Sequence, residues 1–371
     1  MSLSAVLRNK RVLVLCGAGG VGKTTTAAAL GVAAARAGRK VLVLTIDPAR
    51  RLAEAMGLPE SGTEPTAVAP HILHGSKAAG AGQLDVWMLD PGIVFERMVR
   101  RLSPSPEAVR SILEHRFYGF LTELVAGIQE YAAAEALDQY IHEGQHELIV
   151  LDTPPSRHAL DFLDAPGRLA RFLDDRIVAL FGPQEASGGG LWRRATRLIG
   201  NVLGTIFGET FTGELRTFIG ATSGLFAGIR LRSDRLRERL SSAEATFLLV
   251  TSPEAAALEE VRYFQQTLTE RGLPCAGYVL NRSWAREESL PTPQDLRRQV
   301  PPGDAAASAG VDALEQLAQR ERTRAQEHRE LLTQLAKNLP KGSVAVAAPE
   351  ASGELESFEG LARLGESLAA R

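Results

Sequence analysis

One turn near the N-terminus constrains the fold of this chain more than any other stretch. Residues 17–24 read GAGGVGKT, the pattern G-x-x-x-x-G-K-[ST] of a phosphate-binding P-loop. The turn follows an apolar run, residues 12–16, and opens an Ala-rich helical pattern over residues 25–37. A strand before the glycines and a helix after them is the setting in which such a loop binds phosphate. The alternative is a plain glycine-rich connection, and the presence of all eight positions argues against it.

The residue types in this turn predict how a nucleotide would be held. The glycines let the backbone curl so that its N–H groups point inward, and the helix N-terminus adds a partial positive charge. Lys23 can reach the outer phosphates as a point charge, and Thr24 offers a hydroxyl to Mg²⁺. The predicted binding residues of this loop are Gly19, Gly20, Val21, Gly22, Lys23 and Thr24.

Further apolar runs predict a parallel sheet. Seven short segments read as buried strands, and helical patterns separate most of them: 11–16, 40–46, 84–89, 147–151, 246–251, 275–280 and 343–347. This alternation predicts an α/β fold with a doubly wound, mostly parallel sheet of seven or eight strands. Residues 57–83 are rich in Gly, Pro, Ala and Ser and read as a long loop. The N-terminus is expected to run straight into the first strand.

Two aspartates follow strands at the edge where open α/β sheets bind ligands. Asp47 directly follows the strand at 40–46, and Asp152 directly follows the strand at 147–151. A strand with a terminal Asp downstream of a P-loop is the expected second anchor for Mg²⁺, which assigns Asp152 to the metal. The alternative for each aspartate is that it caps the N-terminus of the following helix.

Composition limits which ligands the chain can bind and in which cellular compartment it is expected. A formal net charge of −2 gives no bulk reason to bind nucleic acid. Only two cysteines, Cys16 and Cys275, exclude a disulfide framework and a cysteine-rich metal site within the chain. No uncharged apolar run reaches the roughly 18 residues that span a bilayer. These features predict a cytoplasmic protein.

The motifs together resemble one family. The segments GAGGVGKTT at 17–25, TIDPARRL at 45–52 and DTPPSRHALDFLDAP at 152–166, with Asn281 after the strand at 275–280, are similar to those of the arsenite-pump and tail-anchored-protein-targeting ATPases. That family belongs to the deviant P-loop class, and the last long motif looks most like its bacterial branch, the "anion-transporting" ATPases. The resemblance covers nearly the whole chain.

The resemblance implies roles for individual residues. Lys23 would contact the β- and γ-phosphates, and Thr25 the α-phosphate. Asp47 would position or activate the attacking water, and Asp152 would hold Mg²⁺ through water. Asn281 would read the adenine edge, with Pro349 on the other side of the base pocket. ATP and Mg²⁺ are therefore the implied cofactors, with Lys23 and Asp47 as the catalytic residues.

One departure from the family stands in the P-loop itself. Members carry a second lysine just after the first P-loop glycine, where this chain has Ala18. A transition state that gathers negative charge still needs a cation. Arg157 or a heterologous subunit could supply it, and Arg50 and Arg51 are further candidates. The alternative is that these arginines are solvated surface charges.

Histidines do not form an evident metal site. His142 and His146 have i,i+4 spacing, and His71 and His74 lie in the expected loop. A surface position is favoured over zinc for all four. His158 in the third motif could relay the nucleotide state or be structural.

A helical subdomain is expected within a single ATPase domain spanning residues 1–371, formed by residues 95–145 and 166–242. Residues 191–231 are apolar and Gly-spaced, with few charges. In the targeting ATPases the corresponding segment builds a groove for a hydrophobic client helix. The alternative, slightly favoured, is that these residues form the core of the subdomain or a dimer contact.

The leading functional hypothesis is a Mg²⁺-dependent ATPase. It would work as a homodimer, or as a heterodimer with a related ATPase, on a hydrophobic or membrane-associated client, and it would not bind nucleic acid. One alternative is a MinD-like positioning ATPase, which would need a basic amphipathic terminal helix; residues 355–371 carry little positive charge. The other is a P-loop metabolic ligase.

Overall fold

A single eight-stranded sheet organises the chain. The computed structural model describes residues 2–45, 62–75, 82–116, 128–153, 234–286, 305–337, 342–349 and 357–370, with a few single residues between these ranges. The strand order is β3-β4-β2-β5-β1-β6-β7-β8. All neighbours are parallel except β3 and β4. The predicted α/β fold with a doubly wound, mostly parallel sheet is confirmed.

Most strands begin or end within one residue of their predicted bounds. The strands are β1 (Val12–Cys16), β2 (Lys40–Thr45), β3 (Thr66–Ala67), β4 (Gln83–Met88), β5 (Leu148–Asp152), β6 (Ala245–Thr251), β7 (Cys275–Leu280) and β8 (Val344–Ala347). β1 lies at the centre, between β5 and β6. Every residue of β1, β5 and β6 is buried, which explains why these strands read as continuous apolar runs.

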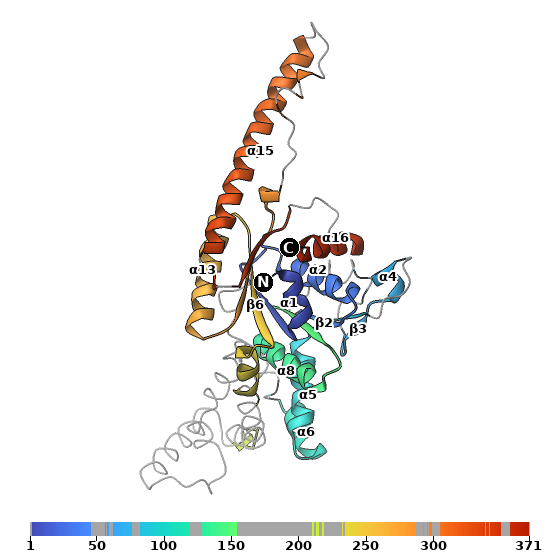
Figure 1. Ribbon diagram of the computed structural model, residues 1–371. Coiled ribbons are helices and arrows are strands. Elements are labelled where there is room, and N and C mark those ends of the chain that lie inside the picture. The colour runs from blue at the N-terminus through green and yellow to red at the C-terminus, as the bar shows by residue number, and fades with distance from the viewer. Residues whose placement is uncertain are drawn as a thin grey trace, which may run out of the picture.

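Helices cover both faces of the sheet (Figure 1). One face packs against α1 (Leu3–Asn9), α2 (Lys23–Arg36), α4 (Pro70–His74) and α16 (Phe358–Ala369). The other packs against α5 (Pro91–Leu102), α8 (Ile128–Glu143), α13 (Ala255–Glu270) and the C-terminal end of α15 (Ala305–Lys337). A further helix, α6 (Pro106–Leu113), follows α5. The two apolar layers form the core.

The structure corrects two sequence-based expectations. The N-terminus does not run straight into β1, because α1 comes first, capped by the Ser2 side chain and packed through Leu3, Val6 and Leu7. The stretch 57–83 is not one long loop, since it contains β3 and α4. These elements have two and five residues, too short for hydrophobic periodicity to reveal them. His71 is exposed as expected, but it lies in α4 rather than in a loop.

The terminal helix α16 is docked on α2. Its apolar residues Leu361, Leu364 and Leu368 are buried. Arg36 of α2 forms ion pairs with Glu359 and Glu366 at 3.0 and 3.2 Å. The backbones approach closely at Gly365, where an added Cβ would lie 2.0 Å from the carbonyl oxygen of Ala29.

Substituting alanine at Gly365 is expected to destabilise the chain by about 1–3 kcal/mol, because the new methyl group would force α16 away from α2. Gly310 in α15 is the matched control, since nothing lies within 4 Å of its added Cβ. Gly310→Ala is expected to leave stability unchanged or raise it, as alanine favours helices. Urea unfolding of both variants measures this; an equal effect of the two substitutions would contradict the close packing of α16 on α2.

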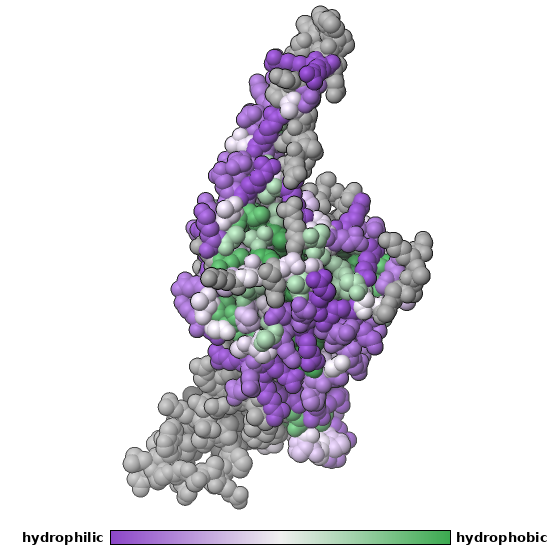
Figure 2. Space-filling model, viewed as in Figure 1, coloured by the Kyte–Doolittle hydropathy of each residue, from purple (hydrophilic) through white to green (hydrophobic). Residues whose placement is uncertain are grey.

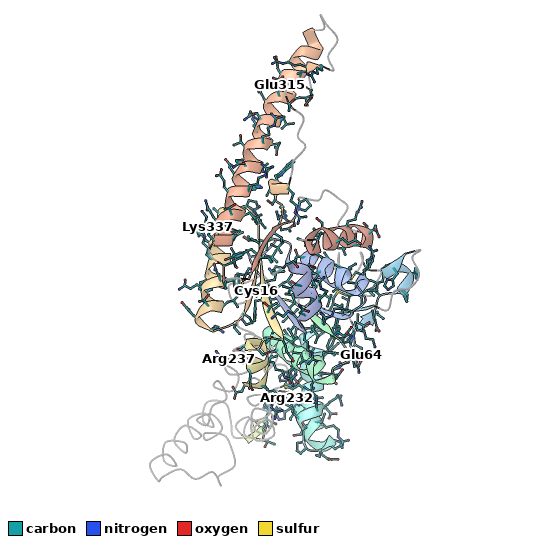
Figure 3. All side chains as sticks on the ribbon, viewed as in Figure 1. Cys16, Glu64, Arg232, Arg237, Glu315 and Lys337 are labelled. Atoms are coloured by element: carbon teal, nitrogen blue, oxygen red, sulfur yellow. The ribbon has the colours of Figure 1, made fainter. Side chains whose placement is uncertain are left out.

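The long helix α15 leaves the body of the molecule. Leu335 near its C-terminal end is buried in the core, whereas its N-terminal part projects beyond the sheet (Figure 1). The projecting part is mostly hydrophilic at its surface (Figure 2). Figure 3 marks its course, with Lys337 beside the body and Glu315 near the far end. Its 33 residues span about 50 Å at the helical rise of 1.5 Å per residue.

None of the helices that the structure describes is long and apolar enough to cross a bilayer.

A buried histidine just before β5 pairs with an aspartate of β4. His146 is 7% exposed, and its Nε2 donates to Oδ2 of Asp85 at 2.7 Å. The surface position expected for His146 is therefore wrong, whereas His142 is exposed as expected. Among the described residues, no group of three or more His, Cys, Asp and Glu side chains could hold a metal ion. Burial by itself would raise the pKa of Asp85, but hydrogen bonds from His146 and Gln83 outweigh it and hold that pKa below its usual value.

This depressed pKa predicts a loss of stability in acid. A carboxylate whose pKa is lower in the folded state stabilises the fold above its unfolded pKa of about 3.9, and that contribution disappears as pH falls through the lower folded value. Asp85→Asn removes the titrating group. The drop in the free energy of unfolding between pH 6 and pH 3 should therefore be smaller in this variant than in the wild type. Equal drops would show that Asp85 does not contribute.

Candidate functional site

The candidate site lies at the carboxyl edge of the sheet, where β1 is the point at which the strand order reverses. From β1 the chain goes first toward β2 and later to β6 on the other side. Open α/β sheets bind ligands at such a reversal. The P-loop leaves β1 there. Asp152 ends the neighbouring strand β5, whereas Thr45 ends β2 and Asn281 follows β7, each one strand further out.

The P-loop has the backbone of a phosphate-binding turn. Gly20 and Gly22 have φ values of 75° and 89°, which favour glycine. Gly22 is also the N-cap of α2, so the loop leads directly into the N-terminus of that helix. An added Cβ at Gly22 would lie 2.2 Å from Nδ2 of Asn281, so glycine is required there for space as well. Helix N–H groups and a curled glycine loop together form an anion-binding concavity.

Lys23 is folded against this loop. The side chain is buried, and its Nζ donates to the carbonyl oxygens of Gly17 and Ala18 at 2.9 and 2.8 Å. The ammonium group therefore lies directly at the turn. Ala18 is buried and contributes its carbonyl to this contact.

Two hydroxyls and a carboxylate converge beside the lysine. Oγ1 of Thr24 donates to Oδ2 of Asp152 at 2.5 Å, and Oγ1 of Thr45 donates to the same oxygen at 3.0 Å. The parallel register explains the convergence, because Asp152 is aligned with Leu15 of β1 and with Thr45 of β2. Asp152 is almost fully buried.

This donor set fits magnesium. Mg²⁺ prefers hard oxygen ligands, and here a threonine hydroxyl and a carboxylate lie within hydrogen-bonding distance next to a phosphate-binding turn. The pairing predicted from the sequence, Thr24 with Asp152, is brought together by the fold. Thr45 was not singled out by the sequence analysis, although it begins the quoted motif at 45–52. Its signal was its place at the carboxyl end of a strand.

The predicted base-recognition residues lie on the other side of the loop. Nδ2 of Asn281 donates to the carbonyl oxygen of Val21 at 2.8 Å, so the amide is held against the P-loop. Ser283 donates through its backbone N–H to the carbonyl of Ala348, the residue before Pro349. Pro349 is exposed and directly follows Ala348, the residue bonded to Ser283. Asn281 and Pro349 thus share one edge with the P-loop.

The two cysteines have raised thiol pKa values, which makes them poor nucleophiles and metal ligands. Burial raises the pKa of the Cys16 thiol to about 12, so this residue is a small buried hydrophobe, as expected. Figure 3 places it in the middle of the molecule. Burial likewise raises the pKa of Cys275 to about 11, although that side chain is only partly buried.

Several predicted residues lie outside the part of the chain that the structure describes: Asp47, Arg50, Arg51, Arg157 and His158. Their roles remain predictions from the sequence. The same holds for most of residues 166–231, which include the apolar, Gly-spaced segment.

Comparison with known proteins identifies the family. Residues 10–184 match the family model described as anion-transporting ATPase. The chain is 29% identical over 272 residues to the ATPase ARSA2 of Chlamydomonas reinhardtii, a match that covers 72% of this chain and 66% of the relative. It is 27% identical over 157 residues to a putative arsenical pump-driving ATPase 1 of Aquifex aeolicus, covering 42% of this chain and 38% of the relative. It is 23% identical over 288 residues to an ATPase ASNA1 homolog 1 of Paramecium tetraurelia, covering 76% and 78% of the two chains.

The matched stretches thus span about two thirds of the algal protein and well under half of the Aquifex protein. The matched region of the family model contains the P-loop and the Thr24–Asp152 pair described above. Residues 10–184 thus belong to the ArsA-type anion-transporting ATPase family, and the relatives that the chain resembles include proteins named ASNA1 homolog and, in Mycosarcoma maydis, ATPase GET3.

Proposed function

We propose that this chain is a Mg²⁺-dependent ATP hydrolase. The observation that carries the proposal is the convergence of Lys23, Thr24 and Asp152 at the mouth of a glycine turn that opens a helix. Phosphoryl transfer to water depends mainly on positioning and on neutralising charge, and these groups supply both.

Each group has a role that its present contacts support. Lys23 and the N–H groups of residues 19–22 would bind phosphate oxygens. Anionic oxygens are stronger acceptors than the two carbonyls that Lys23 now contacts, so a triphosphate can draw the ammonium group from them. Thr24 and Asp152 would hold Mg²⁺, Asp152 through water, and the ion would neutralise charge on the phosphates.

Further residues complete the proposed nucleotide site. Thr25 would contact the α-phosphate, and Asn281 and Pro349 would enclose the base. Asp47 would orient the attacking water. A cation in place of the lysine missing at Ala18 would come from Arg157 or from a second subunit.

We further propose that the chain works as a dimer, either of two copies or with a related ATPase. Nucleotide state would open and close the helical subdomain of residues 95–145 and 166–242 on a hydrophobic or membrane-associated client. Contacts between the two segments support one subdomain. The buried Glu135 of α8 pairs with Arg101 of α5 and with Arg232, the latter at 3.1 Å, and Arg116 pairs with Glu214 at 2.6 Å.

The MinD-like alternative is less well supported. It would use a terminal helix with a free apolar face for membrane recruitment. The apolar residues of α16 are instead buried against α2. A P-loop ligase differs in needing a second substrate before phosphate is released.

Phosphate release by the full chain, with ATP as the sole substrate, tests the proposal. We expect hydrolysis that requires Mg²⁺. A protein that binds ATP but releases phosphate only with a second substrate would favour the ligase. Sedimentation with and without ADP–aluminium fluoride and Mg²⁺ tests the dimer, which should form in their presence; a chain that stays monomeric with or without a related ATPase would contradict it.

A further inference from the structure

The turn after β7 has the least ordinary backbone at the candidate site. Arg282 has a φ of 53°, the one positive value recorded for a non-glycine residue in the described part of the chain. Residues with a side chain rarely adopt this conformation, and it persists where surrounding groups hold it. Arg282 directly follows Asn281, whose side chain is bonded to the P-loop.

Helix α15 supplies two of the bonds that hold this turn. The backbone N–H of Trp284 donates to Nδ1 of His328 at 3.0 Å, and Nε of Arg329 donates to the carbonyl of Ala285 at 3.1 Å. His328 is 6% exposed, so its ring is buried in the interior. Both residues lie where α15 passes the carboxyl edge of the sheet, at the short helix η2 (Trp284–Arg286) that follows the turn.

We propose that His328 and Arg329 are positioning residues for recognition of the nucleotide base. They hold the strained turn, and the turn holds Asn281 against Val21. The inference rests on the proposed function, since it requires a nucleotide at the P-loop.

The chemistry of the amide gives this arrangement a consequence. A backbone carbonyl can only accept, so the bond to Val21 fixes the nitrogen of Asn281 toward the loop. Its Oδ1 is then oriented as an acceptor. Adenine presents an exocyclic amine, which donates to such an oxygen, whereas guanine presents a carbonyl oxygen at the corresponding position. A correctly held Asn281 therefore favours ATP over GTP, and a displaced one does not.

The test compares two substitutions of the same residue in the full chain. His328→Leu removes the acceptor for Trp284 and fills the buried position with an apolar side chain. His328→Asn keeps an acceptor oxygen close to the position of Nδ1. Dissociation constants are measured by calorimetry, with Mg²⁺, for non-hydrolysable ATP and GTP analogues and for tripolyphosphate, which has no base.

We expect His328→Leu to weaken binding of the ATP analogue about five- to tenfold, the effect of losing one buried hydrogen bond. Binding of tripolyphosphate and of the GTP analogue should stay near wild-type values, and His328→Asn should restore most of the preference. His142→Leu, at an exposed histidine of α8, is the matched control and should change nothing. Val261→Ala, in the buried face of α13, lowers stability without altering the ratio of the two affinities.

Three results would overturn the inference and leave the proposed function standing. One is an ATP preference that survives His328→Leu. If that variant does not fold, an ATP preference that survives Arg329→Met has the same meaning. Another is an equal loss for the ATP analogue and for tripolyphosphate, which would indicate general damage to the loop. A wild-type chain that binds tripolyphosphate but shows no preference for ATP would remove the role of the turn. A wild-type chain that binds neither ATP nor tripolyphosphate would instead overturn the proposed function, together with this inference.

Discussion

Replacing Lys23 with alanine is expected to lower the rate of ATP hydrolysis at least about 100-fold, the typical effect of removing a preorganised group that stabilises charge in the transition state. The side chain is buried at the turn, and no compensating lysine stands at Ala18. Steady-state phosphate release measures this effect on kcat.

Lys40→Ala is the matched control for this substitution. Lys40 is an exposed lysine that begins β2, at the opposite edge of the sheet from the P-loop. Its loss should leave kcat within about twofold of the wild type, as expected for an exposed charge away from the site. If Lys23→Ala hydrolysed ATP as fast as Lys40→Ala, the phosphate-binding role of the loop would be wrong.

Replacing Asp152 with asparagine is expected to raise the Mg²⁺ concentration needed for half-maximal hydrolysis about 10- to 100-fold. The substitution removes a negative charge but keeps the size of the side chain. The hydroxyls of Thr24 and Thr45 now donate to the carboxylate, and either hydroxyl can accept from an amide instead. The metal-free fold should therefore tolerate the change better than the metal site does.

A magnesium titration of hydrolysis at saturating ATP measures this shift. Asp312→Asn is the control, since Asp312 lies on the projecting part of α15 with 67% of its side chain exposed. An unchanged Mg²⁺ requirement in Asp152→Asn would mean that this carboxylate only caps the backbone after β5. That capping role is the alternative that the sequence leaves open.

The carboxyl edge of the sheet could be predicted because its signals are local. The P-loop occupies consecutive residues, and Asp152 follows directly on an apolar run. In a parallel sheet all carboxyl ends meet at one edge, so strand assignment alone brings Thr24 and Asp152 together. The register then adds Thr45, which sequence reasoning could not align with Asp152 across 107 positions.

Contacts between distant segments could not be predicted in the same way. The spacing of His146 favours a surface position, because nothing local signals its partner Asp85, which lies 61 positions away on β4. The hydrogen bond from the backbone N–H of Trp284 to His328 of α15 joins residues 44 positions apart. Its donor is a backbone group, which every residue except proline has, so the sequence gives no signal for it. The helix α1 left a fainter signal, Leu3, Val6 and Leu7 after Ser2, within only seven residues.

The measurement that tests the central claim most directly is phosphate release from ATP by the purified chain over a range of Mg²⁺ concentrations. It is made for the wild type and for Lys23→Ala and Asp152→Asn. The proposed site predicts hydrolysis by the wild type that depends on Mg²⁺, near-complete loss in Lys23→Ala, and a shifted Mg²⁺ dependence in Asp152→Asn. Magnesium-dependent hydrolysis that both variants retain unchanged would show that the convergence of Lys23, Thr24 and Asp152 is not the catalytic site.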